Sequence, residues 1–103
     1  MIAASQCEIE IVLAIIKRYV PGCVVLAFGS RYKWTNTDTS DLDLAVVCDG
    51  NASNSAIWGM QNEFMESDLP FRVDVVNYNA VSDEFRRIID EGNEMIYCPR
   101  HPA

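Results

Sequence analysis

Apolar residues along the chain follow two periods, one typical of helices and the other typical of strands. Between residues 7 and 20 they recur every three or four positions, which gives a helix one apolar face, and Pro21-Gly22 ends that helix. A second helical pattern covers residues 57–65 and stops before a proline. A third helix is predicted over 82–92, with a capping serine and two acidic residues at its start and a glycine at its end.

Strands are predicted where apolar residues run together or alternate with polar ones. The run "CVVLAF" at 23–28 is apolar throughout, whereas "DLDLAVVC" at 41–48 and "FRVDVVNY" at 71–78 carry aspartates among apolar residues. A last short strand is expected at "EMIYC", 94–98. The order helix, strand, strand, helix, strand, helix, strand predicts an α/β fold in which helices flank a small mixed sheet.

Two aspartates lie at the start of the second predicted strand. Side chains alternate between the faces of a strand, so Asp41 and Asp43 point to one face while Leu42 and Leu44 point to the core. Two adjacent carboxylates repel each other and resist desolvation unless one is protonated, water reaches them or a cation binds between them. Asp74 repeats the pattern in the third strand, and a cation site is the sharpest of these hypotheses.

Length and charge limit the classes of protein to which the chain can belong. Its 103 residues, half of them hydrophobic, indicate one globular domain over 1–103, with residues 98–103 as a flexible Pro-rich tail. The net charge is -7 and the eight Lys and Arg residues are scattered, so we expect no direct nucleic-acid partner. Neither a membrane span nor a signal peptide is predicted, which favours a cytoplasmic protein.

The four cysteines form no Cys-x-x-Cys pair. They are Cys7, Cys23, Cys48 and Cys98, and most of them stand in apolar runs. Free cysteine behaves as a small hydrophobic residue, so we expect buried free thiols rather than disulfides or metal ligands.

Three motifs taken together resemble a known superfamily. Gly29-Ser30 follows a predicted strand, "SDLDLAVV" places Asp41 and Asp43 on the next one, and "SDLPFRVDVVN" places Asp74 on a third. In this order they resemble the nucleotidyltransferase superfamily that includes DNA polymerase beta. The likeness is closest to its minimal nucleotidyltransferase branch, small proteins found as antitoxins beside HEPN-domain toxins, and it extends over nearly the whole chain.

The resemblance implies a polymerase beta-like fold and a site for two Mg²⁺ ions with ATP as the substrate. Mg²⁺ takes oxygen ligands and is usually shared between carboxylates and phosphates. Asp41 and Asp43 are then the shared metal ligands, and Asp74 binds the catalytic ion and accepts the proton of the acceptor hydroxyl.

The resemblance also implies a phosphate-binding loop. Gly29 lets the backbone approach the phosphates, and the Ser30 hydroxyl helps to hold them. Arg31 is either a phosphate contact or a surface charge, and Ser40 either braces the strand entry or is an ordinary loop residue. Relatives commonly have glycine where this chain has Trp34, so we expect the loop to lack a glycine-type backbone angle at that position.

The function implied is transfer of AMP from ATP to a hydroxyl acceptor. A domain of this size has little surface left for the acceptor, so a partner is expected to supply it, and in the family it resembles that acceptor is a tyrosine of the cognate HEPN toxin. The chain would then be a type VII antitoxin. Two alternatives stay open: an inactive module that neutralises a helical partner by contact, and a transferase acting on small molecules such as aminoglycosides.

Overall fold

The computed structural model describes residues 2, 4–29, 33–34, 41–48 and 54–99. The predicted order of elements is confirmed. They are helix α1 (Gln6–Tyr19), strands β1 (Val24–Phe28) and β2 (Leu42–Val47), helix α3 (Asn54–Glu66), strand β3 (Val73–Asn77), helix α4 (Asp83–Glu91) and strand β4 (Glu94–Tyr97). The predicted tail at 98–103 lies outside the described residues from position 100 onward.

The four strands form one mixed sheet in the order β3-β2-β1-β4. Strand β1 is antiparallel to both β2 and β4, whereas β2 and β3 are parallel and joined through α3. The α/β fold with a mixed sheet is therefore confirmed. The topology brings β2 and β3, the two strands that carry aspartates, side by side.

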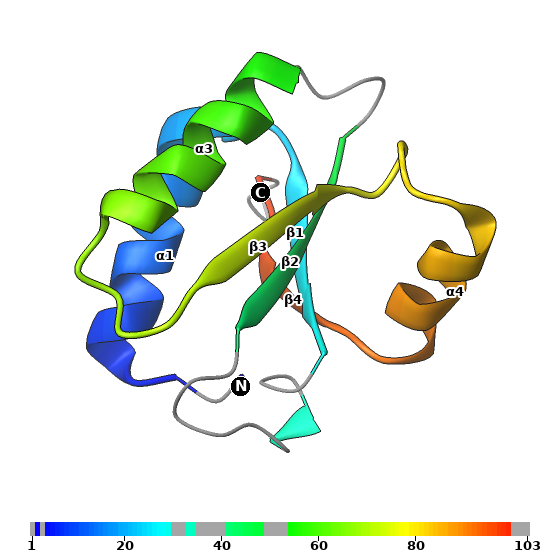
Figure 1. The fold of residues 1–103 in the computed structure, drawn as a ribbon, viewed down its shortest axis with the longest axis horizontal. Coiled ribbons are helices and arrows are strands. Elements are labelled where there is room, and N and C mark those ends of the chain that lie inside the picture. Colours follow the sequence, from blue (N-terminus) through cyan, green and yellow to red (C-terminus); the bar gives the residue numbers. More distant parts are fainter. Residues whose placement is uncertain (1, 3, 30–32, 35–40, 49–53, 100–103) are drawn as a thin grey trace.

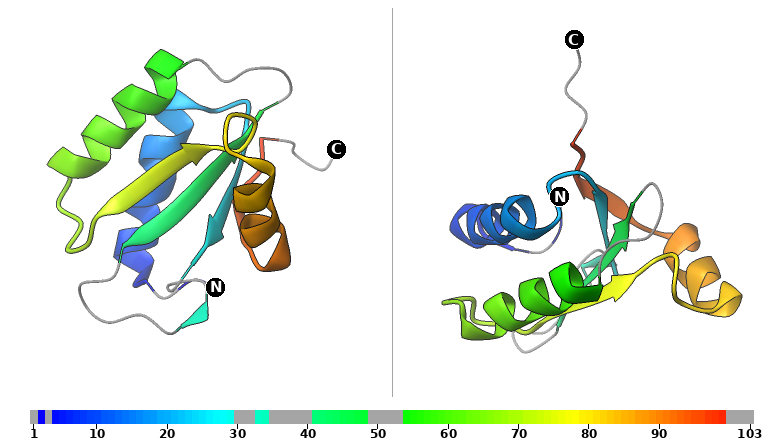
Figure 2. Two further views of the ribbon diagram at one scale, coloured as in Figure 1. Left: turned by 45° about the vertical axis from the view of Figure 1, so that its right-hand side comes forward. Right: turned by 90° about the horizontal axis from the view of Figure 1, so that it is seen from above.

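The two faces of the sheet are covered unequally. Helices α1 and α3 pack together over one face, and α4 lies alone on the other (Figures 1 and 2). The main core lies under α1 and α3, with fully buried side chains that include Ile16, Leu42, Leu44, Met60 and Val73. Phe28, Ala45 and Ile89 form a smaller cluster beneath α4. The sheet face toward α4 therefore has room for polar side chains.

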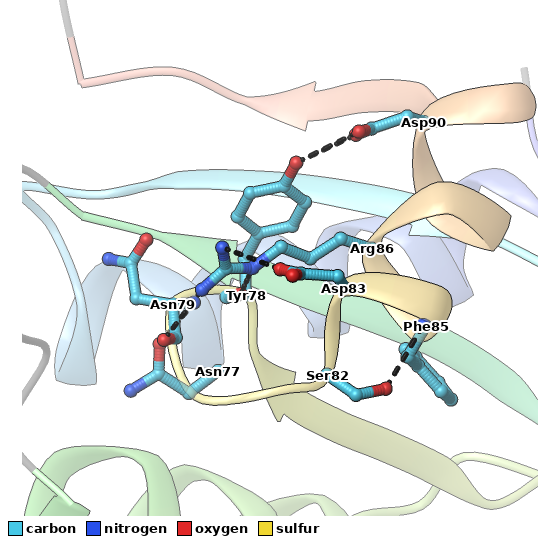
Figure 3. Close-up of polar contacts among 8 residues, drawn as sticks. All are labelled: Asn77, Tyr78, Asn79, Ser82, Asp83, Phe85, Arg86 and Asp90. Carbon is cyan, nitrogen blue, oxygen red and sulfur yellow. Dashed lines mark hydrogen bonds and ion pairs between the residues drawn. The ribbon is translucent and has the colours of Figure 1, made fainter.

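Helix α4 is held at the end of β3 by polar contacts (Figure 3). Arg86 donates hydrogen bonds to the carbonyl oxygens of Tyr78 at 2.9 Å and Asn79 at 2.8 Å, and the Tyr78 hydroxyl donates to Asp90 at 2.8 Å. The predicted cap is confirmed, since the Ser82 hydroxyl accepts a hydrogen bond from the Phe85 backbone N–H at 3.2 Å. These contacts fix α4 beside the sheet although it buries few side chains.

The prediction of four buried free thiols is wrong. Cys23 and Cys48 form a disulfide between the start of β1 and the end of β2, with their Cα atoms 4.5 Å apart, and Cys7 and Cys98 are exposed free cysteines. The register explains the pair: Val24 lies opposite Val47, so the next position along each strand places the two cysteines opposite each other. Antiparallel pairing, which the sequence alone does not reveal, decides this contact.

Among the described residues, no helix is both long and apolar enough to cross a membrane.

Candidate active site

Asp43 and Asp74 are direct neighbours in the sheet. The parallel register of β2 and β3 places Asp43 opposite Asp74, and the antiparallel register of β1 places Phe28 on the other side of Asp43. Side chains that are register partners project from the same face, here the face toward α4. Asp41 precedes Asp43 by two positions and belongs to the same face. The structure thus brings together the three aspartates that the sequence singled out.

The Asp43 carboxylate is in an electrostatically unfavourable position. Burial raises its pKa, and the neighbouring charges of Asp74 and Asp41 raise it further, to about 6. A carboxylate in this position gains more than an ordinary one from a cation, since the cation cancels both repulsions. The arrangement therefore favours the binding of a cation.

Gly29 lies directly against Asp43. Its φ of 80° belongs to the left-handed region, and a Cβ added there would overlap Asp43 Oδ2 and stand 3.3 Å from Asp43 Cγ. Glycine is needed here for two separate reasons, the backbone angle and the space. The conformation turns the chain away from β1 immediately beside the carboxylates.

The expectation for Trp34 is wrong. Its φ is 60°, so the loop uses a glycine-type backbone angle there with tryptophan in place of glycine. The side chain is 64% exposed, and an exposed side chain can be accommodated at such an angle without displacing core atoms. The other predicted loop residues, Ser30, Arg31 and Ser40, lie outside the described residues.

Two further residues contact the β3 aspartate or the backbone of its neighbours, and the sequence reasoning did not single them out. Arg72 Nε donates to Asp74 Oδ1 at 3.0 Å, so a guanidinium already pairs with one carboxylate. The Gln61 amide of α3 donates to the Val73 carbonyl at 2.5 Å and accepts from the Val75 N–H at 2.9 Å. Gln61 thus bonds to the backbone on both sides of Asp74, as a neighbouring strand would.

Strand alternation could have indicated Arg72, because it stands two positions before Asp74 and so shares its face. No signal in the sequence indicates Gln61. Its contact depends on how α3 packs against the outer edge of β3, which is a tertiary relationship.

The donor set fits a hard divalent cation. Within the described ranges, no three Asp, Glu, His or Cys side chains are already arranged so that they could hold a metal ion. The chemistry nevertheless fits, because Asp41, Asp43 and Asp74 offer oxygen ligands on one face, and burial together with the neighbouring charges raises the pKa of Asp43. Arg72 gives one of these carboxylates a positive partner within the protein itself.

A known protein family matches most of the chain. Residues 10–101 match the family described as Polymerase beta, Nucleotidyltransferase. The chain belongs to this nucleotidyltransferase family. A Haemophilus influenzae protein named "Probable protein adenylyltransferase MntA" is 42% identical over 82 residues, which cover 80% of this chain and 72% of that protein.

Solved structures of toxin–antitoxin complexes share the nucleotidyltransferase fold. A chain of a toxin–antitoxin crystal structure with AMP-PNP superposes with a TM-score of 0.74 at 21% identity, covering 87% of this chain and 73% of that one. A chain from the complex of tri-AMPylated Shewanella oneidensis HEPN toxin with MNT antitoxin gives a TM-score of 0.68 at 19% identity, with 90% and 71% covered. The polymerase beta-like fold predicted from the motifs is confirmed.

Proposed function

We propose that this nucleotidyltransferase transfers AMP from ATP to a hydroxyl group of a partner protein. The observation that carries the proposal is a pair of contacts. Asp43 on β2 lies beside Asp74 on β3, and Gly29, just after β1, packs against Asp43. The crowded carboxylates can bind a cation, and the glycine beside them lets phosphates approach the backbone. ATP is the nucleotide that fits the family relationship best, since one structural neighbour contains AMP-PNP.

In the proposed reaction the acceptor hydroxyl oxygen attacks the α-phosphorus of ATP. The new O–P bond forms as the bond from the α-phosphorus to the oxygen bridging the β-phosphate breaks, so pyrophosphate leaves and the acceptor carries AMP through a phosphodiester. The hydroxyl proton passes to Asp74 and then to solvent. The Asp74 side chain is 36% exposed on the edge strand, which leaves it accessible to an acceptor.

Asp41, Asp43 and Asp74 are the residues that would hold Mg²⁺, with two ions expected from the family resemblance. When bound, Mg²⁺ supplies positive charge that neutralises the phosphates and favours ionisation of the attacking hydroxyl. The chain itself keeps the carboxylates on one face and leaves space at Gly29. Ser30 and Arg31 remain the predicted phosphate contacts, and Ser40 the predicted brace of the strand entry.

The proposed partner is a HEPN-domain toxin, and the proposed acceptor is one of its tyrosines. Support comes from the adenylyltransferase name of the Haemophilus relative and from the structural neighbour in which an MNT antitoxin accompanies an AMPylated HEPN toxin. The chain would act in the cytoplasm as a type VII antitoxin. Its net charge of -7 would speed encounter with a more basic partner.

One observation favours a second candidate function. The Arg72 guanidinium already pairs with Asp74, and in a site that no longer binds a metal ion such a pair would offset the charge of this carboxylate. In that case the chain would neutralise its partner by contact alone. An active chain instead needs Asp74 to exchange Arg72 for the metal when ATP binds.

Co-expression of the chain with the protein encoded by the neighbouring gene distinguishes AMP transfer from neutralisation by contact. Each transferred AMP adds about 329 Da to the partner, so intact-mass analysis detects the modification directly. We expect the mass shift with the wild-type chain and none with Asp43→Asn, which removes a charge at nearly constant volume. Asp83→Asn is the matched control, since that side chain is 92% exposed on α4. Partner binding without any mass shift would establish the contact-only function instead.

A further inference from the structure

A pocket of about 360 Å³ opens beside the carboxylates, where α3 ends and the chain enters β3. Its wall is mainly apolar and includes Phe64, Met65 and Leu69. Its polar lining comes from Asp41 and Arg72. The volume lies at the lower end of the range for small-molecule sites, which suits a single large side chain.

The pocket shares two residues, Asp41 and Arg72, with the candidate active site. Arg72, which lines the pocket, is the residue that pairs with Asp74 at 3.0 Å. The Leu42 N–H donates to the Arg72 carbonyl at 2.8 Å, which ties the strand entries that carry Asp41 and Arg72 to each other. A side chain that enters this pocket with its polar end toward Asp41 and Arg72 would therefore lie at the border of the candidate active site.

We propose that this pocket binds the acceptor side chain, and that the side chain it fits is an aromatic ring bearing a hydroxyl group, a tyrosine of the partner protein. This inference rests on the proposed function and adds the place where the acceptor binds. A ring covers the apolar wall, and a methionine such as Met65 makes favourable sulfur–aromatic contacts. The phenolic hydroxyl reaches the polar lining. A serine or threonine would leave the apolar wall uncovered, and a sugar would lack polar partners along it.

The outer surface of α3 continues the pocket as a docking surface for the protein that carries the tyrosine. Trp58 is 70% exposed and Met65 is 69% exposed. They stand seven positions apart, so they lie on the same side of the helix. Tryptophan and methionine are enriched where proteins bind one another, and here the two exposed side chains lie on one side of α3, with Met65 at the pocket.

Methionine methyl groups allow a direct binding test, because the chain has only four methionines. The Met65 methyl reports on the pocket, Met95 is a similarly exposed control at 56% on β4, and Met60 is a buried control in the core. The methionines are labelled with carbon-13 and the chain is titrated with N-acetyl-tyrosinamide. We expect a saturable shift at Met65 that is several times larger than the shift at Met95, and little change at Met60.

N-acetyl-phenylalaninamide supplies the matched probe that lacks the hydroxyl. We expect it to bind at Met65 more weakly than the tyrosine probe, because it has no hydroxyl group to form a hydrogen bond with the polar lining. Equal affinities would overturn hydroxyl recognition by the pocket. A Met65 shift that does not exceed the Met95 shift would overturn the pocket as a binding site.

Transfer kinetics then separate this inference from the proposed function. With the partner as acceptor, Met65→Ala should raise KM for the partner by about fivefold to tenfold and leave KM for ATP unchanged. Met95→Ala should change neither constant. If the wild-type chain transfers AMP and Met65→Ala is indistinguishable from it, the pocket assignment fails. If the tyrosine probe shifts Met65 but no AMP is transferred to any partner, the proposed function fails and the aromatic site stands.

Discussion

Gly29 and Asp43 pack so closely that the space between them excludes even a methyl group, since an added Cβ would overlap Asp43 Oδ2. The contact joins the end of β1 to the strand that carries the central carboxylate. Gly29 also has a φ of 80°. The positive φ and the lack of space for a Cβ thus both require glycine at this position, which lies beside the proposed active site.

Gly29→Ala should therefore lower stability and abolish AMP transfer. The left-handed angle and the overlap together should cost about 2 to 4 kcal/mol of unfolding free energy, measured by urea denaturation. Gly22→Ala is the control, because a Cβ at Gly22 meets no atom within 4 Å and its φ lies outside the left-handed region. That variant should stay within about 1 kcal/mol of wild type. A fully active, fully stable Gly29→Ala protein would contradict the close packing against Asp43.

Asp43→Asn should stabilise the metal-free chain at neutral pH. The pKa of Asp43 is raised to about 6 in the folded protein, so the folded state holds its proton more firmly than the unfolded state does. Wild-type stability therefore falls as pH rises from about 4 to about 6, and the whole penalty is present above the folded pKa. Because Asp43 is only partly buried, we expect Asp43→Asn to gain about 1 to 2 kcal/mol at pH ~7.5 in EDTA.

The pH series contains its own control. At pH ~3 and below, both states of wild type are largely protonated at Asp43, so the advantage of Asp43→Asn should disappear. Adding Mg²⁺ at pH ~7.5 should stabilise wild type more than the variant, by preferential binding to the folded state. An advantage of Asp43→Asn that is independent of pH would point to packing rather than charge.

Gln61→Ala should loosen the edge of the sheet that carries Asp74. The substitution removes hydrogen bonds to the Val73 carbonyl and the Val75 N–H, and we expect a loss of about 1 to 2 kcal/mol. The Val75 amide should exchange its hydrogen roughly tenfold faster, while amides in β1 are little changed. Asn62→Ala removes a neighbouring amide from the same helix and serves as the control. Unchanged exchange at Val75 would show that Gln61 does not hold this edge.

Reduction of the Cys23–Cys48 disulfide should lower stability without touching the site. The bond closes a loop with a sequence separation of 25, for which the chain-entropy estimate is about 3.5 kcal/mol. Urea denaturation with and without dithiothreitol measures the loss, and the Cys23→Ser/Cys48→Ser double variant should be insensitive to the reductant. Alkylation in intact cells followed by mass analysis shows whether the pair is oxidised where the chain acts. Four alkylated cysteines there would mean that the reduced form is the working one.

The sequence by itself determined the elements and the face on which the acidic residues lie. Helical and strand periods are local properties, so α1, α4 and the strands are recognisable from short windows, and Ser82 caps its helix through its own turn. Alternation along one strand is equally local, and it already put Asp41 and Asp43 on the face opposite Leu42.

Only the tertiary structure decided which of these residues meet. The pairing of Asp43 with Asp74 depends on the parallel register of two strands separated by a helix, and the disulfide depends on an antiparallel register. Gln61 reaches β3 only because α3 packs along its outer edge. Register and packing are set by the burial of the whole core at once, so no local window contains them. The same global burial raises the pKa of Asp43, so the acidic residues that the sequence pattern places on one face form a site that favours a cation.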